Sequence, residues 1–190
     1  MLLLLLACTG ETDTGECLVE TGDQIGTIEP ECACETPEIE VGTTVIDEQE
    51  GRAVAVFASV DDKLRMVHGD QGGWHVEGAV RLWNTRSVVN LVSRVVHPVT
   101  GVEVGPEQTH YVQLVDEDTC QGSFPGITLF LFTDDPVYED QNVAQALSCE
   151  SLKVEICAED SAGRSLCGEE TWEVWPDQAD VDTGLVDDCE

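Results

Sequence analysis

Basic residues are scarce in this sequence of 190 residues, which has 8 lysines and arginines against 39 aspartates and glutamates. The formal net charge is −31 at pH 7. Proteins that bind nucleic acids need lysine and arginine to neutralise phosphates, so this balance excludes a nucleic-acid partner. Apolar residues still make up 42% of the chain, which is enough to build a folded core.

Motifs of common enzyme classes are also lacking. The sequence contains no Gly-x-Ser-x-Gly, no His-Glu-x-x-His and no glycine-rich phosphate loop. Residues 121–126 place a serine near glycines, but their spacing predicts a turn. The histidines are scattered singly along the chain, at His68, His75, His97 and His110. We therefore expect a protein that is not an enzyme and that binds no cofactor.

No apolar run is long enough to span a bilayer, which requires about 20 residues. The apolar residues 1–7 are instead typical of an export signal. The motif Leu5-Leu6-Ala7-Cys8 resembles the lipobox of bacterial lipoproteins, in which the signal is cut before the cysteine and the cysteine is acylated. This resemblance implies a signal peptide over residues 1–7, a lipid anchor on Cys8 and, because Thr9 follows, sorting to the outer membrane. An ordinary secretory signal, with Cys8 in a disulfide, is the alternative.

Nine cysteines in so short a chain predict an oxidising compartment. If Cys8 is acylated, an even number remains, so every other cysteine can form a disulfide. A metal or redox pair at Cys32-Ala33-Cys34 is the alternative for two of them. The expected disulfide cysteines are Cys17, Cys32, Cys34, Cys120, Cys149, Cys157, Cys167 and Cys189.

Composition divides the mature chain into three parts. Residues 8–40 are acidic and lack apolar periodicity, which predicts a disordered N-terminal tether. Residues 41–176 carry the folded domain, and residues 177–190 form an acidic C-terminal tail. Like charges along the tether would keep it extended from the membrane.

The domain has the alternating pattern of short β-strands separated by turn residues. Residues 97–101 are a turn signal, and only residues 143–147 suggest a helical turn. The pattern predicts an all-β fold, an antiparallel sandwich of about seven to eight strands. The expected strands cover residues 54–60, 76–82, 87–96, 102–104, 111–115, 127–133, 152–158 and 171–175.

The last two of these strands form a hairpin whose register can be derived. A three-residue loop ending at a left-handed Gly163 would pair Asp160 with Arg164 and place Cys157 opposite Cys167. The two Cα atoms would lie about 4.5 Å apart in a non-hydrogen-bonded pair, within the range that a disulfide tolerates. We therefore predict a Cys157–Cys167 disulfide.

The other pairings follow only from position along the chain. A Cys120–Cys149 bridge would enclose the strand near residue 130 and contribute roughly 3–4 kcal/mol. Cys17, Cys32, Cys34 and Cys189 would then pair among themselves and join the tether to the tail. Because eight cysteines allow many connectivities, these pairings are hypotheses.

Residues 152–175 resemble the closing hairpin of immunoglobulin-like bacterial surface domains. The resemblance rests on an alternating strand, then Ala158-Glu159-Asp160 and Gly163-Arg164, then a return strand. It implies an immunoglobulin-like sandwich. It does not imply the inter-sheet disulfide of true immunoglobulin domains, because no cysteine lies between residues 34 and 120.

Two recognition functions remain as alternatives. Acidic groups at residues 61–62, 116–118, 134–135 and 139–140 follow predicted strands and could converge on calcium, although a solvated acidic surface is the simpler interpretation. No residue is assigned as a metal ligand, because no loop has the required spacing. Trp175, with Trp74, Trp83 or Tyr111, could stack on a sugar ring if these side chains were not part of the core.

The sequence therefore predicts a lipid-anchored protein of the bacterial cell envelope with a structural, adhesive or partner-binding role. Its expected partners are the membrane, through the lipid anchor, and a protein or glycan. A calcium- or glycan-binding recognition module on the same scaffold is the alternative.

Overall fold

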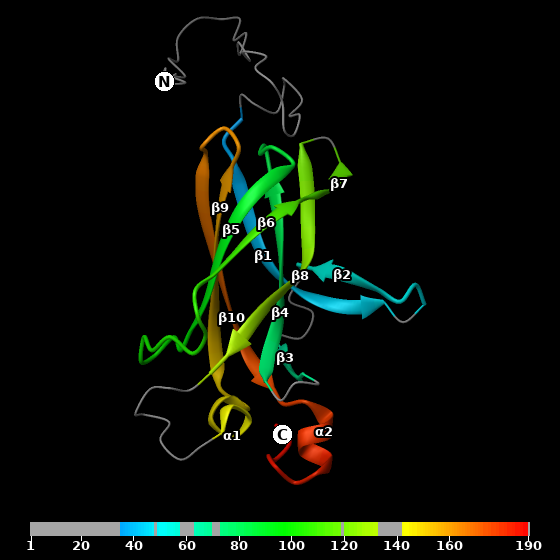
Figure 1. Cartoon of the computed structure of the whole chain (residues 1–190), viewed down its shortest axis with the longest axis vertical. Coiled ribbons are helices and arrows are strands. Elements are labelled where there is room, and N and C mark those ends of the chain that lie inside the picture. The colour runs from blue at the N-terminus through cyan, green and yellow to red at the C-terminus, as the bar shows by residue number, and fades with distance from the viewer. Residues whose placement is uncertain are drawn as a thin grey trace, which may run out of the picture.

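The computed structural model describes residues 35–47, 49–57, 63–69, 73–118, 120–132 and 142–189. These residues form a mostly β fold with two short helices (Figure 1). In chain order, the elements are β1 (Glu38–Asp47), β2 (Arg52–Val56), β3 (Lys63–His68), β4 (Trp74–Trp83), β5 (Val88–Val96), β6 (Gln108–Gln113), β7 (Val115–Asp118), β8 (Gln121–Leu131), α1 (Val143–Leu147), β9 (Ser151–Asp160), β10 (Ser165–Trp175) and α2 (Gln178–Asp182).

The strands form one curled sheet in the order β2-β1-β4-β3-β10-β9-β5-β6, with β8 paired to β4 and β7 paired to β8. The all-β expectation is confirmed. The expectation of a purely antiparallel arrangement is wrong, because β3 and β10 run parallel and place Leu64 opposite Val174. On its other side, β3 pairs antiparallel with β4. This strand therefore joins the two halves of the sheet and makes the sheet mixed.

Most predicted strands are confirmed, but their set was incomplete. β4, β5 and β9 match predictions, and β2, β6, β8 and β10 overlap theirs, whereas β1 and β3 have no counterpart and β7 shares only Val115 with a predicted strand. The turn predicted over residues 121–126 is wrong, because these residues form the first half of β8, which pairs with β4. The turn at residues 97–101 is confirmed, since Gly101 N donates to His97 O. The predicted strand at 102–104 is wrong, because that segment makes only an isolated bridge between Glu103 and Val96.

The core lies between the two halves of the curled sheet. Close approach of β1 to β10 depends on Gly168, where an added Cβ would lie 3.1 Å from side-chain atoms of both Ile39 and Val41. On β9, alternate side chains are completely buried, as the period-two pattern predicts. These side chains are Leu152, Val154, Ile156 and Ala158.

β1 bends near Gly42, so that its first half pairs with β4 and its second half pairs with β2. A Cβ at Gly42 would lie 2.4 Å from the carbonyl oxygen of Val56, which explains why glycine occupies the bend. Beyond the bend, Thr44 Oγ1 donates to Gly78 O and accepts from Gly126 N, both at 2.7 Å. The second half of β1 and β2 leave the rest of the sheet from this point as a projecting hairpin (Figure 1).

The C-terminal residues, which the sequence assigns to a tail, include helix α2. The helix lies at the same end of the molecule as α1 (Figure 1). Asp177 caps its first turn by accepting a hydrogen bond from Ala179 N. Within the described ranges, no helix has the length and apolar character needed to cross a membrane.

Candidate functional site

Several residues singled out from the sequence lie outside the described residues. They include the lipidation residue Cys8 and the acidic pairs at 61–62, 134–135 and 139–140; residues 116–118 lie on or at the end of β7. Within the described part of the chain, no group of three or more histidine, cysteine, aspartate or glutamate side chains could hold a metal ion. The N-terminal disulfide candidates also lie outside this part, namely Cys17, Cys32 and Cys34.

The Cys157–Cys167 disulfide is confirmed. The two cysteines face each other across β9 and β10 with Cα atoms 4.0 Å apart. The loop before Arg164 has the expected geometry, with Gly163 at a φ of 78°. Asp160 N donates to Arg164 O, which fixes the register of the hairpin.

The predicted Cys120–Cys149 bridge is wrong, because Cys149 pairs with Cys189 at a Cα separation of 5.5 Å. Cys120 lies near Asn84, because the backbone N–H of Asn84 donates to the carbonyl oxygen of Cys120. Cys149 N donates to Val174 O at the other end of the domain, separated from Cys120 by the ten-residue strand β4, about 30 Å long. That span far exceeds the reach of a disulfide. Cys120 is also disulfide-bonded. Its partner is none of the other cysteines that the structure describes, because those form the pairs Cys149–Cys189 and Cys157–Cys167.

The aromatic residues considered for glycan stacking do not converge. Trp74 and Trp83 occupy opposite ends of β4, and Tyr111 is exposed on β6. Trp175 is covered by Lys63, whose Nζ lies 3.5 Å from the ring centroid. These side chains therefore do not form one platform.

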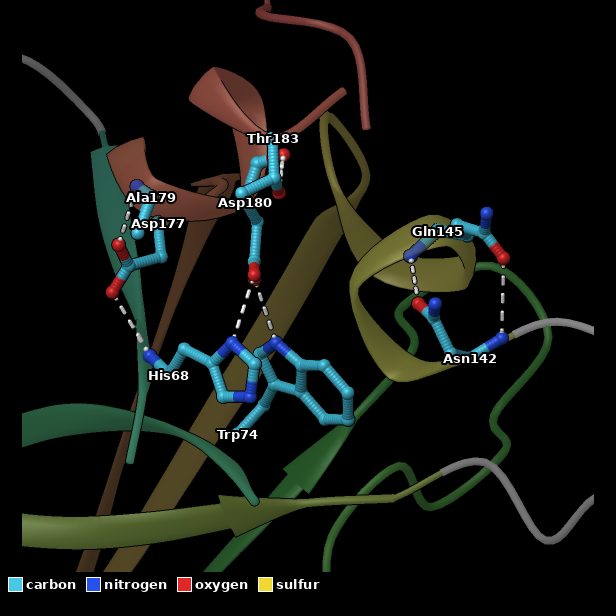
Figure 2. Close-up of polar contacts among 8 residues, drawn as sticks. All are labelled: His68, Trp74, Asn142, Gln145, Asp177, Ala179, Asp180 and Thr183. Carbon is cyan, nitrogen blue, oxygen red and sulfur yellow. Dashed lines mark hydrogen bonds and ion pairs between the residues drawn. The ribbon is translucent and has the colours of Figure 1, made fainter. Parts of the chain in front are cut away.

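A polar cluster that no sequence pattern predicts links α2 to β3 and β4 (Figure 2). Asp180 is only 3% exposed, and both of its carboxylate oxygens have partners. Oδ1 lies 2.8 Å from His68 Nδ1, and Oδ2 accepts from Trp74 Nε1 at 2.8 Å. The His68 and Trp74 rings stack with centroids 4.6 Å apart. The cluster holds the C-terminal helix against the sheet through a buried carboxylate.

Asp177 makes the second connection between this helix and β3. Its Oδ2 accepts from His68 N at 2.9 Å, and its Oδ1 accepts from Ala179 N at 2.9 Å (Figure 2). Burial alone would raise the pKa of Asp177, but the hydrogen bonds from His68 and Ala179 outweigh burial and hold this pKa below its usual value. The carboxylate form is therefore the form that stabilises the helix.

Replacing Asp177 with alanine is expected to lower the free energy of unfolding by about 1 kcal/mol at pH 7, because a helix cap is lost. Because the folded pKa is depressed, the contribution of Asp177 is complete above the unfolded pKa of about 3.9 and is lost as the pH falls through the folded pKa. Urea unfolding at pH 7 and pH 3, followed by tryptophan fluorescence, measures both effects. Asp177→Asn, which keeps an acceptor for the cap, should lose less. A difference between wild type and Asp177→Ala that grows on acidification would contradict this account.

Ion pairs connect β5, β9 and β10 on the outer face of the sheet. Lys153 Nζ lies 2.5 Å from Glu155 and 3.1 Å from Glu169, and Arg94 Nε donates to Glu155. The hydrogen bond from Lys153, together with that from Arg94 and against the effect of burial, holds the pKa of Glu155 below its usual value. Because these ion pairs lie at the surface, each is expected to contribute little to the free energy of unfolding.

The projecting hairpin carries apolar side chains that its own domain does not cover. Val45 is 47% exposed and Ile46 is 59% exposed, opposite Val54 and Ala53 respectively. Neighbouring residues of a strand point to opposite faces, so both faces of the hairpin are apolar. An exposed apolar surface of this kind is typical of a contact site for another macromolecule.

The outer edge of this hairpin is open. β2 stands at the end of the strand order, and no other described strand pairs with its second edge. Its backbone can therefore offer N–H donors and carbonyl acceptors to an additional strand.

No protein-family model matches the chain, and no curated protein is significantly similar to it in sequence.

Proposed function

We propose that this protein is a lipid-anchored component of the bacterial cell envelope that binds a protein partner through an immunoglobulin-like domain. The lipobox-like motif Leu5-Leu6-Ala7-Cys8 supports the anchor. In this proposal Cys8 holds the chain at the outer membrane, the acidic segment between Cys8 and the start of β1 acts as the tether, and the β domain makes the contact. The role is structural or adhesive rather than catalytic.

The strand order supports the immunoglobulin-like arrangement. In that fold, strands A, B, E and D form one sheet and strands C, F and G form the other. The neighbours β1-β4-β8-β7 and β5-β9-β10 follow the same two orders when the strands are lettered along the chain, with β6 next to β5. Contacts between β1 and β10 and between β5 and β8 bring the two halves together, as in a sandwich.

The projecting β1–β2 hairpin is the observation that carries partner binding. Its exposed Val45 and Ile46 lie beside an unpaired strand edge. In a chain of which 25% is charged, an exposed segment of uncharged side chains is costly to solubility unless another molecule covers it. A tethered adhesive or structural protein needs such a surface.

The anchor is tested by replacing Cys8 with serine in the full chain expressed in a Gram-negative bacterium. The wild-type protein should sediment with the membrane fraction and incorporate labelled fatty acid, whereas Cys8→Ser should do neither, because the acceptor for the acyl chains is absent. Cys17→Ser is the matched control and should remain membrane-bound. Membrane association that survives Cys8→Ser would overturn the anchor.

A further inference from the structure

The flanks of the projecting hairpin differ from the rest of the chain in charge. The segments 43–46 and 53–57 contain no charged residue, although the chain as a whole has a net charge of −31. We propose that β2 binds an extended, positively charged segment of a partner protein, which adds to the sheet as a further strand. This inference rests on the proposed partner-binding function and specifies the chemistry of the partner.

The first step of the argument concerns the backbone. Exposed edge strands usually carry lysine, proline or a bulge that prevents pairing with another chain. β2 has none of these after its first residue, Arg52, and continues Ala-Val-Ala-Val to Val56. An extended peptide can therefore form main-chain hydrogen bonds along β2, as in other cases of strand addition.

The second step concerns the side chains. Val54 pairs with Val45 on one face of the hairpin, and Ala53 pairs with Ile46 on the other. A strand added beside β2 would place its alternate residues next to these apolar pairs. The partner segment should therefore have apolar residues at the alternate positions that lie on the face of the Val45–Val54 pair, and its other positions can carry charged side chains.

The third step concerns charge. The tip of the hairpin, residues 47–52, contains three acidic residues and the single base Arg52, which forms an ion pair with Glu50. A second copy of this chain would bring another net charge of −31 to the interface, so repulsion opposes self-association. A segment with lysine or arginine between its apolar residues complements both the tip and the net charge.

The test uses the full chain in neutral detergent and a fluorescein-labelled eight-residue peptide of alternating lysine and valine. Main-chain hydrogen bonds do not depend on a particular side-chain sequence. This generic probe should therefore bind and should slow hydrogen exchange of the β2 amides. A glutamate–valine peptide of the same length should bind at least about tenfold more weakly, and a lysine peptide with two prolines should not protect the β2 amides.

Val45→Lys should weaken binding of the lysine–valine peptide by about tenfold, because it places a like charge on the apolar face of the hairpin, with only β2 between it and the added strand. Val99→Lys is the matched control, since Val99 is 87% exposed at a turn far from the hairpin, and it should leave the affinity unchanged. Both residues are exposed, so neither change should unfold the domain.

Three outcomes would overturn the inference: equal binding of the acidic peptide, no binding of the basic peptide, or equal effects of the two lysine substitutions. A concentration-dependent dimer with protected β2 amides in the absence of peptide would assign the edge to a second copy instead. None of these results alters membrane association through Cys8, so failure of this inference is distinguishable from failure of the proposed anchor.

Discussion

Replacing both Cys149 and Cys189 with serine is expected to lower the free energy of unfolding by about 4 kcal/mol. The bridge joins residues 40 positions apart, and closing a loop of that length restricts the unfolded chain by about this amount in the chain-entropy model. The bridge also holds the C-terminal segment near Val174, because Cys149 N donates to the carbonyl oxygen of that residue. Urea unfolding of the full chain, followed by tryptophan fluorescence, measures the loss.

The Cys157–Cys167 disulfide provides the matched comparison. It joins residues only 10 positions apart, so its double serine variant should lose less, about 2.7 kcal/mol in the same model. A larger loss for this variant than for the Cys149–Cys189 variant, or an unchanged stability of the latter, would contradict the assignment of Cys189 to Cys149.

Asp180→Ala is expected to lower the free energy of unfolding by about 3 kcal/mol. The substitution removes the hydrogen bonds of the buried Asp180 carboxylate with Trp74 Nε1 and His68 Nδ1, and a hydrogen bond to a charged group contributes about 1.5–3 kcal/mol. Because these contacts hold α2 against β3 and β4, the amides of α2 should also exchange faster with solvent. Urea unfolding and hydrogen exchange measure the two effects.

Asp182→Ala is the control for this prediction. Asp182 lies on the same helix but is exposed, and its only described contact is a hydrogen bond from Gln178. Its loss should change stability by less than about 0.5 kcal/mol. Equal effects of Asp180→Ala and Asp182→Ala would show that the buried cluster does not hold the helix.

Local patterns predicted the closing hairpin in detail. The position of Gly163 fixed the loop, the loop fixed the register, and the register placed Cys157 opposite Cys167. Each step depends on residues within about ten positions of one another, where turn chemistry and period-two alternation act directly.

The strands that were missed lack a clean local signal. In β1, the alternation of Ile39 and Val41 stops at the Gly42 bend, and its acidic flank has the composition of a tether. β3 has only Leu64 and Met66 as buried apolar residues, because it is short and its burial depends on both β4 and β10. Tertiary packing, rather than local pattern, makes these segments strands.

The candidate sites depend on contacts that are remote in sequence. His68 and Asp180 are 112 residues apart, so no motif spacing links them. Proximity in the chain predicts Cys120 as the partner of Cys149, whereas the docking of α2 brings Cys189, which is 40 residues away, to Cys149. The open edge of β2 is likewise a consequence of strand order, which the sequence does not encode locally.

The most direct test of the proposed anchor and disulfides is the intact mass of the membrane-fraction protein before and after reduction. The account predicts the mass of residues 8–190 plus acyl chains on Cys8, with a gain on reduction that corresponds to four disulfides among the eight remaining cysteines. An unacylated mass, or Cys8 recovered in a disulfide-linked peptide, would contradict it.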